Sequence, residues 1–120
     1  MRILVADDSR VMRQIVVRTL RQAGFGGHEI VEAVDGADAL AKVGEHAPDL
    51  VLSDWNMPNM TGIELLRALR AAGDTTAFGF VTSEGSDDMQ EIAQNAGARF
   101  VIVKPFTAEA FESALSPVLG

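Results

Sequence analysis

Residues 50–58 read Leu-Val-Leu-Ser-Asp-Trp-Asn-Met-Pro, a short apolar run that leads into an acidic residue, Asp54. Four further apolar runs lie at fairly even intervals along the chain, at residues 3–6, 30–33, 78–81 and 100–103. Most of these runs lack alternating polar residues, which is typical of strands covered on both faces of a parallel sheet. The pattern therefore predicts five strands of an α/β domain.

The segments between these runs have the apolar spacing of amphipathic helices, as Met12, Val16 and Leu20 illustrate. Thr61 and Glu64 have the spacing of a capping box, which predicts the start of the third helix. Strands that alternate with helices in this way predict a doubly wound α/β fold with right-handed crossovers.

The division of the chain into domains follows from the same pattern. No linker rich in Pro, Gly or Ser, no low-complexity tract and no internal repeat interrupts it. The last helical segment extends nearly to Gly120. We therefore expect one domain over residues 1–120 and no separate output domain.

Composition excludes several classes of function. The chain has 120 residues, of which 48% are hydrophobic, and its 10 Lys and Arg against 17 Asp and Glu give a net charge of −7. This acidic balance argues against nucleic-acid binding and against an anionic membrane surface. The absence of cysteine excludes disulfides and Cys-ligated metals. No apolar run approaches the roughly 20 residues of a membrane span, so we expect a soluble, cytoplasmic protein.

Polar residues follow the predicted strands at the points where the strands end. Asp7 and Asp8 follow the first strand, Asp54 the third, Thr82 the fourth and Lys104 the fifth. Because ligands of parallel α/β sheets bind beyond the carboxyl ends of the strands, we expect these side chains to meet in one site.

The residue types in this site indicate phosphoryl transfer. Three carboxylates in close proximity repel one another unless a cation lies among them, and oxygen ligands favour Mg²⁺. An ammonium group and a metal ion neutralise phosphoryl oxygens while a carboxylate attacks in line. The chemistry therefore predicts an aspartyl-phosphate site.

Four short motifs stand in order after the predicted strands: Asp7-Asp8, residues 53–58, residues 81–84 and Lys104-Pro-Phe106. Through these motifs the chain resembles response-regulator receiver domains over essentially its whole length. Residues 53–66 are similar in particular to the phosphorylation segment of the single-domain chemotaxis members. The resemblance implies a flavodoxin-like (βα)5 fold with a parallel sheet in the order 2-1-3-4-5.

The resemblance also implies a role for each site residue. Asp54 would accept a phosphoryl group from a phosphohistidine of a sensor histidine kinase. Asp8, Asp54 and the backbone carbonyl of Asn56 would ligate Mg²⁺ directly, whereas Asp7 would act largely through water. Lys104 would pair with the phosphoryl group.

Further residues would regulate the site. The Thr82 hydroxyl would bond to the phosphoryl group and draw its loop inward, while Glu84 and Asn56 would influence how fast the acyl phosphate hydrolyses. Many receiver domains have an aromatic residue three positions before the strand-five Lys, but this chain has Val101. We therefore expect no aromatic rotamer switch. The resemblance further implies a cis peptide between Lys104 and Pro105.

The expected partners are the kinase and a downstream protein, with the flagellar motor switch as one candidate, and we expect a monomer. A phosphorelay intermediate or a receiver of another pathway is an open alternative. A small Mg²⁺-dependent phosphohydrolase is a further alternative, although such enzymes usually have Asp-x-Asp after the first strand and a cap domain. In the preferred interpretation the protein is no enzyme and catalyses only its own phosphorylation and dephosphorylation.

Overall fold

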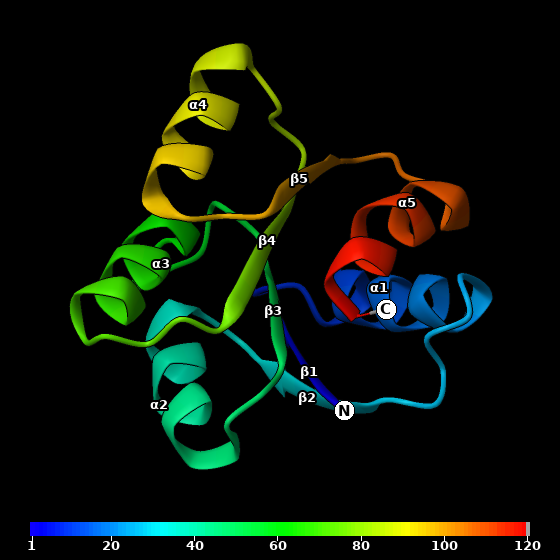
Figure 1. Ribbon diagram of the computed structural model, residues 1–120, viewed down its shortest axis with the longest axis horizontal. Coiled ribbons are helices and arrows are strands. Elements are labelled where there is room, and N and C mark those ends of the chain that lie inside the picture. Colours follow the sequence, from blue (N-terminus) through cyan, green and yellow to red (C-terminus); the bar gives the residue numbers. More distant parts are fainter. Residues whose placement is uncertain (120) are drawn as a thin grey trace.

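The computed structural model describes residues 1–119, in which five strands alternate with five helices (Figure 1). The elements are β1 (Arg2–Ala6), α1 (Arg10–Gln22), β2 (Glu29–Ala33), α2 (Gly36–His46), β3 (Leu50–Ser53), α3 (Gly62–Ala71), β4 (Ala77–Thr82), α4 (Asp87–Ala96), β5 (Phe100–Val103) and α5 (Ala108–Leu119). Each predicted apolar run lies in a strand, and Thr61 with Glu64 forms the predicted capping box before α3. No helix among residues 1–119 has the length and apolar character that a membrane crossing requires.

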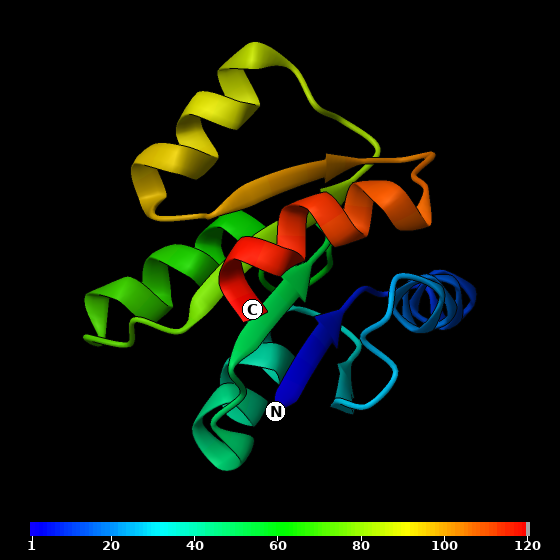
Figure 2. The same ribbon diagram turned by 45° about the vertical axis from the view of Figure 1, so that its right-hand side comes forward.

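The strands form one parallel sheet in the order β2-β1-β3-β4-β5, as the resemblance implies. Figure 2 shows the strand arrowheads directed toward the same end of the sheet. The register aligns the strand ends, because Ala6 of β1 pairs with both Ala33 and Ser53. Asp7 and Asp54, which come next along the chain, therefore leave the sheet side by side.

Two helical layers cover the sheet (Figure 1). Helices α1 and α5 lie on one face, and α2, α3 and α4 lie on the other. Alternate strand residues supply the two cores: Leu4 and Val51 pack toward α2, α3 and α4, whereas Ile3 and Leu52 pack toward α1 and α5. This two-sided burial explains why most strands are continuously apolar.

Helix α3 packs very close to the loop that carries Asp54. A Cβ atom at Gly62, the first residue of α3, would lie well inside van der Waals contact of the Asp54 carbonyl oxygen and of the Phe80 ring. The Gly62 N–H donates to the carbonyl oxygen of Trp55 over 2.8 Å, which holds the two segments at this separation. Glycine is therefore required here by space.

We expect Gly62→Ala to lower the free energy of unfolding by about 1–3 kcal/mol, because an overpacked methyl group displaces backbone or ring atoms. The matched control is Gly44→Ala in α2, where a new Cβ meets nothing within 4 Å. That variant should gain about 0.5–1 kcal/mol from helix propensity. Urea unfolding of the three proteins measures both effects, and a neutral Gly62→Ala would contradict the close approach.

Candidate phosphoryl-transfer site

Three carboxylates meet at the carboxyl end of the sheet. Asp7 and Asp8 follow β1, Asp54 follows β3, and one oxygen from each lies within 4.8 Å of the others. Asp7 is only 4% exposed, Asp54 is partly buried and Asp8 is exposed. The cluster is thus sealed on the protein side and open to solvent at Asp8.

The Lys104 ammonium group lies between two of these carboxylates. Its Nζ atom is 3.4 Å from Asp7 Oδ2 and 3.5 Å from Asp54 Oδ2, and the side chain is largely buried. The backbone of Lys104 is fixed as well, because its N–H donates to the Thr82 carbonyl oxygen over 2.8 Å. One ammonium group opposes three carboxylates, so the ionised cluster retains an excess of negative charge.

The two carboxylate oxygens of Asp54 have different surroundings. Oδ1 accepts the backbone N–H of Trp55 over 2.7 Å, and Oδ2 is the oxygen nearest Lys104. The Trp55 ring packs on Phe80 with a centroid distance of 4.7 Å, which anchors the loop to the core. Asp54 is therefore held in one orientation with Oδ2 directed into the site.

Burial raises the pKa of Asp7 above its usual range. Desolvation is the largest cause, the nearby charge of Asp54 acts in the same direction, and the Ser9 N–H and Lys104 oppose it. The Ser9 N–H donates to Asp7 Oδ1 over 2.9 Å. A buried carboxylate that is costly to ionise and lies beside two others is a site where a cation is favourable.

The donor set fits a hard divalent cation. Mg²⁺ prefers oxygen ligands and retains several of its waters. The three carboxylates provide the oxygens, and the exposed side at Asp8 leaves room for water. Asn56 is exposed to solvent and follows Asp54 by two residues in the same loop. Its backbone carbonyl oxygen is therefore part of the segment that adjoins the cluster.

Thr82 ends β4 beside these charges. The residue is fully buried, and its Oγ1 accepts the N–H of Glu84 over 3.3 Å. Glu84 itself is exposed at the start of the loop that leads to α4. The printed contacts thus join the ends of β1, β3 and β5, and Thr82 ends β4, the strand between β3 and β5.

Comparison with known proteins agrees with this arrangement. Residues 3–116 match the response regulator receiver domain. The chain belongs to the response regulator receiver family. Domains of this family are regulators and not classical enzymes.

Individual relatives align over nearly the whole receiver domain. The chain is 39% identical to the chemotaxis protein CheY of Pseudomonas aeruginosa, with 98% of this chain and 95% of that protein aligned. It is 37% identical to the chemotaxis protein CheY1 of Helicobacter pylori, over 100% of this chain and 98% of that protein. A solved structure of the chemotaxis response regulator CheY4 of Vibrio cholerae superposes with a TM-score of 0.85 at 38% identity, covering 98% of each chain.

Val101 stands three residues before Lys104, the position at which the resemblance implied an aromatic residue. Val101 packs with the core beneath α2, α3 and α4, whereas Phe100 packs with the opposite core beneath α1 and α5. The Phe100 ring occupies the space over Gly79, where a Cβ would collide with it. The two neighbours therefore project to opposite faces of the sheet, as alternation along a strand requires. The cis peptide expected between Lys104 and Pro105 is confirmed.

Sequence patterns did not single out one residue that contacts this receiver site. Arg13 of α1 donates from Nη1 to the Asp7 backbone carbonyl oxygen over 2.7 Å and from Nε to Glu32 over 2.9 Å. Arg13 is followed by Gln14 and preceded by Arg10 in the same helix, so its position does not stand out in the sequence. A backbone acceptor likewise leaves no trace in the sequence.

We expect Asp7→Asn to raise the free energy of unfolding at neutral pH in EDTA, because the pKa of Asp7 is raised by burial and its charged form is therefore disfavoured in the fold. The asparagine amide is uncharged, and its oxygen can still accept the Ser9 N–H. As pH falls through the folded-state pKa, the wild-type carboxyl takes up a proton and the difference between the proteins should disappear.

Urea unfolding of both proteins across the acidic range measures this difference. Asp88→Asn, at an exposed carboxylate of α4, is the control and should show no gain. A stability difference that grows on acidification would contradict the assigned sign.

Proposed function

We propose that this receiver domain accepts a phosphoryl group on Asp54 from a phosphohistidine of a sensor histidine kinase and signals in chemotaxis. The observation that carries the proposal is the orientation of Asp54. Its Oδ1 is held by the Trp55 N–H, and its Oδ2 faces the Lys104 ammonium group. An oxygen of Asp54 attacks the phosphorus, the phosphorus–nitrogen bond breaks, and the electron pair remains on the kinase imidazole.

Lys104 neutralises the transferred group. An ammonium group within 3.5 Å of Asp54 Oδ2 lies within reach of the oxygens of a phosphoryl group on that carboxylate. Asp7, Asp8, Asp54 and the Asn56 carbonyl would hold Mg²⁺, whose chemistry is to neutralise charge on the same oxygens. The domain's own residues catalyse both the transfer and the later hydrolysis, and no free substrate is turned over.

The response to phosphorylation begins at Thr82. Its buried hydroxyl accepts the Glu84 N–H, and a phosphoryl oxygen on Asp54 offers a charged acceptor for the hydroxyl proton. A new bond of this kind draws the loop of residues 83–86 toward the site. Glu84 and Asn56 are both exposed, one in the loop after β4 and the other in the loop after β3, and we expect their side chains to affect the access of water to the acyl phosphate.

The relatives named as chemotaxis proteins support a role in that pathway. The downstream partner would bind the face formed by α4, β5 and α5, and the flagellar motor switch is the candidate for this chain. Val101 gives this face a smaller side chain than the aromatic residue common in the family. The downstream partner must therefore accept a flatter surface at this position.

We expect Asp54→Asn to abolish labelling by acetyl phosphate in the presence of Mg²⁺, because the amide has the shape of the carboxylate without its nucleophilic charge. The wild type should gain one phosphoryl group in Mg²⁺ and far less in EDTA. Intact-mass spectrometry measures both. Asp88→Asn should label like the wild type, and a full adduct on Asp54→Asn would refute the assignment of the nucleophile.

We expect activation by beryllofluoride, a phosphoryl mimic, to move residues 83–86 and to leave the Val101 rotamer unchanged. Valine is β-branched and stiff at χ1, and Phe100 points into the opposite core. Structures with and without the mimic measure these shifts. A Phe100 ring that reoriented into the space beside Thr82 would show the expectation to be wrong.

A further inference from the structure

Arg13 spans the loop that carries two of the three carboxylates. Its backbone N–H donates to the Ser9 carbonyl oxygen over 3.0 Å, while its guanidinium group donates to the Asp7 carbonyl oxygen over 2.7 Å. Asp8 lies between these two acceptors in the sequence. The side chain of Arg13 is only 11% exposed, and its bond to the Asp7 carbonyl oxygen is partly shielded from competing water.

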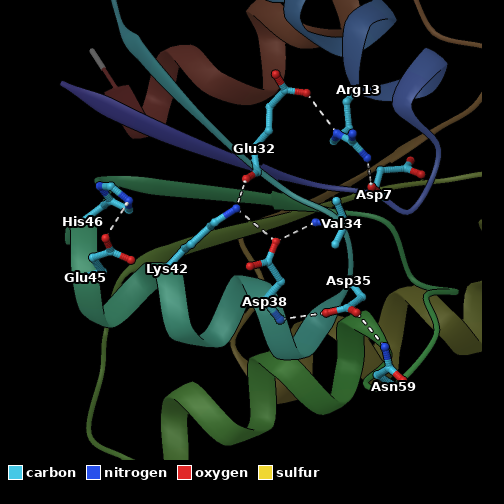
Figure 3. Close-up of polar contacts among 10 residues, drawn as sticks. All are labelled: Asp7, Arg13, Glu32, Val34, Asp35, Asp38, Lys42, Glu45, His46 and Asn59. Atoms are coloured by element: carbon cyan, nitrogen blue, oxygen red, sulfur yellow. Dashed lines mark hydrogen bonds and ion pairs between the residues drawn. The ribbon is translucent and has the colours of Figure 1, made fainter.

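The far side of the guanidinium group is also fixed. Arg13 Nε donates to Glu32 Oε1 over 2.9 Å, and Glu32 lies on the edge strand β2 (Figure 3). The backbone carbonyl oxygen of Glu32 in turn accepts Lys42 Nζ over 2.7 Å, which ties this part of β2 to α2. Arg13 therefore connects the β1–α1 loop to β2 through a side-chain contact, and Lys42 ties the same residue of β2 to α2.

The polar contacts continue to the loop that follows Asp54 (Figure 3). Lys42 pairs with Asp38 at 3.0 Å, the Asp38 N–H donates to Asp35, and Asn59 donates to Asp35 over 2.7 Å. The loops after β1 and after β3 are thus connected around the outside of β2 and α2.

We propose that Arg13 is a positioning residue for the acidic cluster, and that its bond to the Asp7 carbonyl sets the Mg²⁺ affinity of the site. The inference rests on the metal site proposed above. Asp7 is held in the sheet by its N–H, which donates to the Ala33 carbonyl oxygen over 3.1 Å. Arg13 holds the carbonyl side of the same residue, so the peptide that leads to Asp8 has a fixed orientation.

The chain contains a matched arginine for comparison. Arg2 pairs with Glu29 of the same strand β2 at 3.1 Å and donates to the backbone carbonyl oxygen of His46. It makes the same two kinds of contact as Arg13, but at the amino end of the sheet. Any effect common to both arginines is an effect on stability, and an effect of Arg13 alone belongs to the site.

The test uses two charge-neutral double variants in the full chain, Arg13→Met with Glu32→Gln and Arg2→Met with Glu29→Gln. Keeping the net charge constant removes any change in long-range attraction for the cation. Calorimetric titration with Mg²⁺ alone should show about a tenfold loss of affinity for the Arg13 pair, the lower end of the effect of outer partners on metal sites. The Arg2 pair should bind like the wild type.

A second readout is independent of the metal. In EDTA, hydrogen exchange at the Ser9 amide should be faster in the Arg13 pair and unchanged in the Arg2 pair, because Ser9 N–H bonds to Asp7 within the positioned loop. The single variant Arg13→Lys keeps the positive charge but has only one terminal nitrogen. It should therefore bind Mg²⁺ with an affinity between those of the wild type and the Arg13 pair. This single variant also provides the test if the double variant does not fold.

The possible results separate the two proposals. Wild-type Mg²⁺ affinity in the Arg13 variants, or equal losses in the Arg13 and Arg2 pairs, would overturn the positioning role while leaving the metal site intact. A wild-type protein that binds no Mg²⁺ would overturn the metal site and with it the role of Arg13 in affinity. The exchange rate of Ser9 would then decide whether Arg13 orders the loop.

Discussion

The site depends on the parallel register of the sheet at its carboxyl end. The N–H groups of Asp7, Asp54 and Lys104 each donate to the strand beside them, over 3.1, 2.9 and 2.8 Å. These residues are therefore still held by the hydrogen bonds of the sheet, although they stand just beyond the strands. A shift of one residue in any strand would turn its polar side chain toward a helical layer. The register thus fixes the chemistry as well as the fold.

The same register places the carboxylate of Asp7 in a buried position, where its charged form is disfavoured. Desolvation of Asp7 opposes its ionisation, and the excess of carboxylates over Lys104 adds repulsion. Three carboxylates at the N-caps and first turns of helices show the opposite effect, because backbone N–H groups lower the pKa of Asp35, Asp38 and Glu64. The charged forms of Asp35, Asp38 and Glu64 therefore favour the folded state, whereas the charged form of Asp7 opposes it. A buried carboxylate with a perturbed pKa, such as Asp7, is typical of functional sites.

Much of this arrangement follows from sequence patterns, and the exceptions have a common cause. Asp7, Asp54 and Lys104 were predictable because each follows an apolar strand, and the projection of Val101 and Phe100 to opposite faces of the sheet follows from strand alternation. Arg13 and Gly62 were not predictable. Each contacts a backbone group, the Asp7 carbonyl in one case and the Asp54 carbonyl in the other, and a backbone group has no residue type that a sequence pattern could reveal. Contacts between a residue and the backbone of another segment can be recognised only in the folded structure.

The packing of Trp55 gives the protein an optical property. The chain has one tryptophan and no tyrosine, so its intrinsic fluorescence arises almost entirely from one indole ring. That ring lies next to Asp54 in the sequence, packs on Phe80 and is partly open to solvent. Emission wavelength and quenching therefore report the surroundings of a single loop. Ligand exchange at this end of the sheet can be followed in real time in the unmodified protein, without an attached dye.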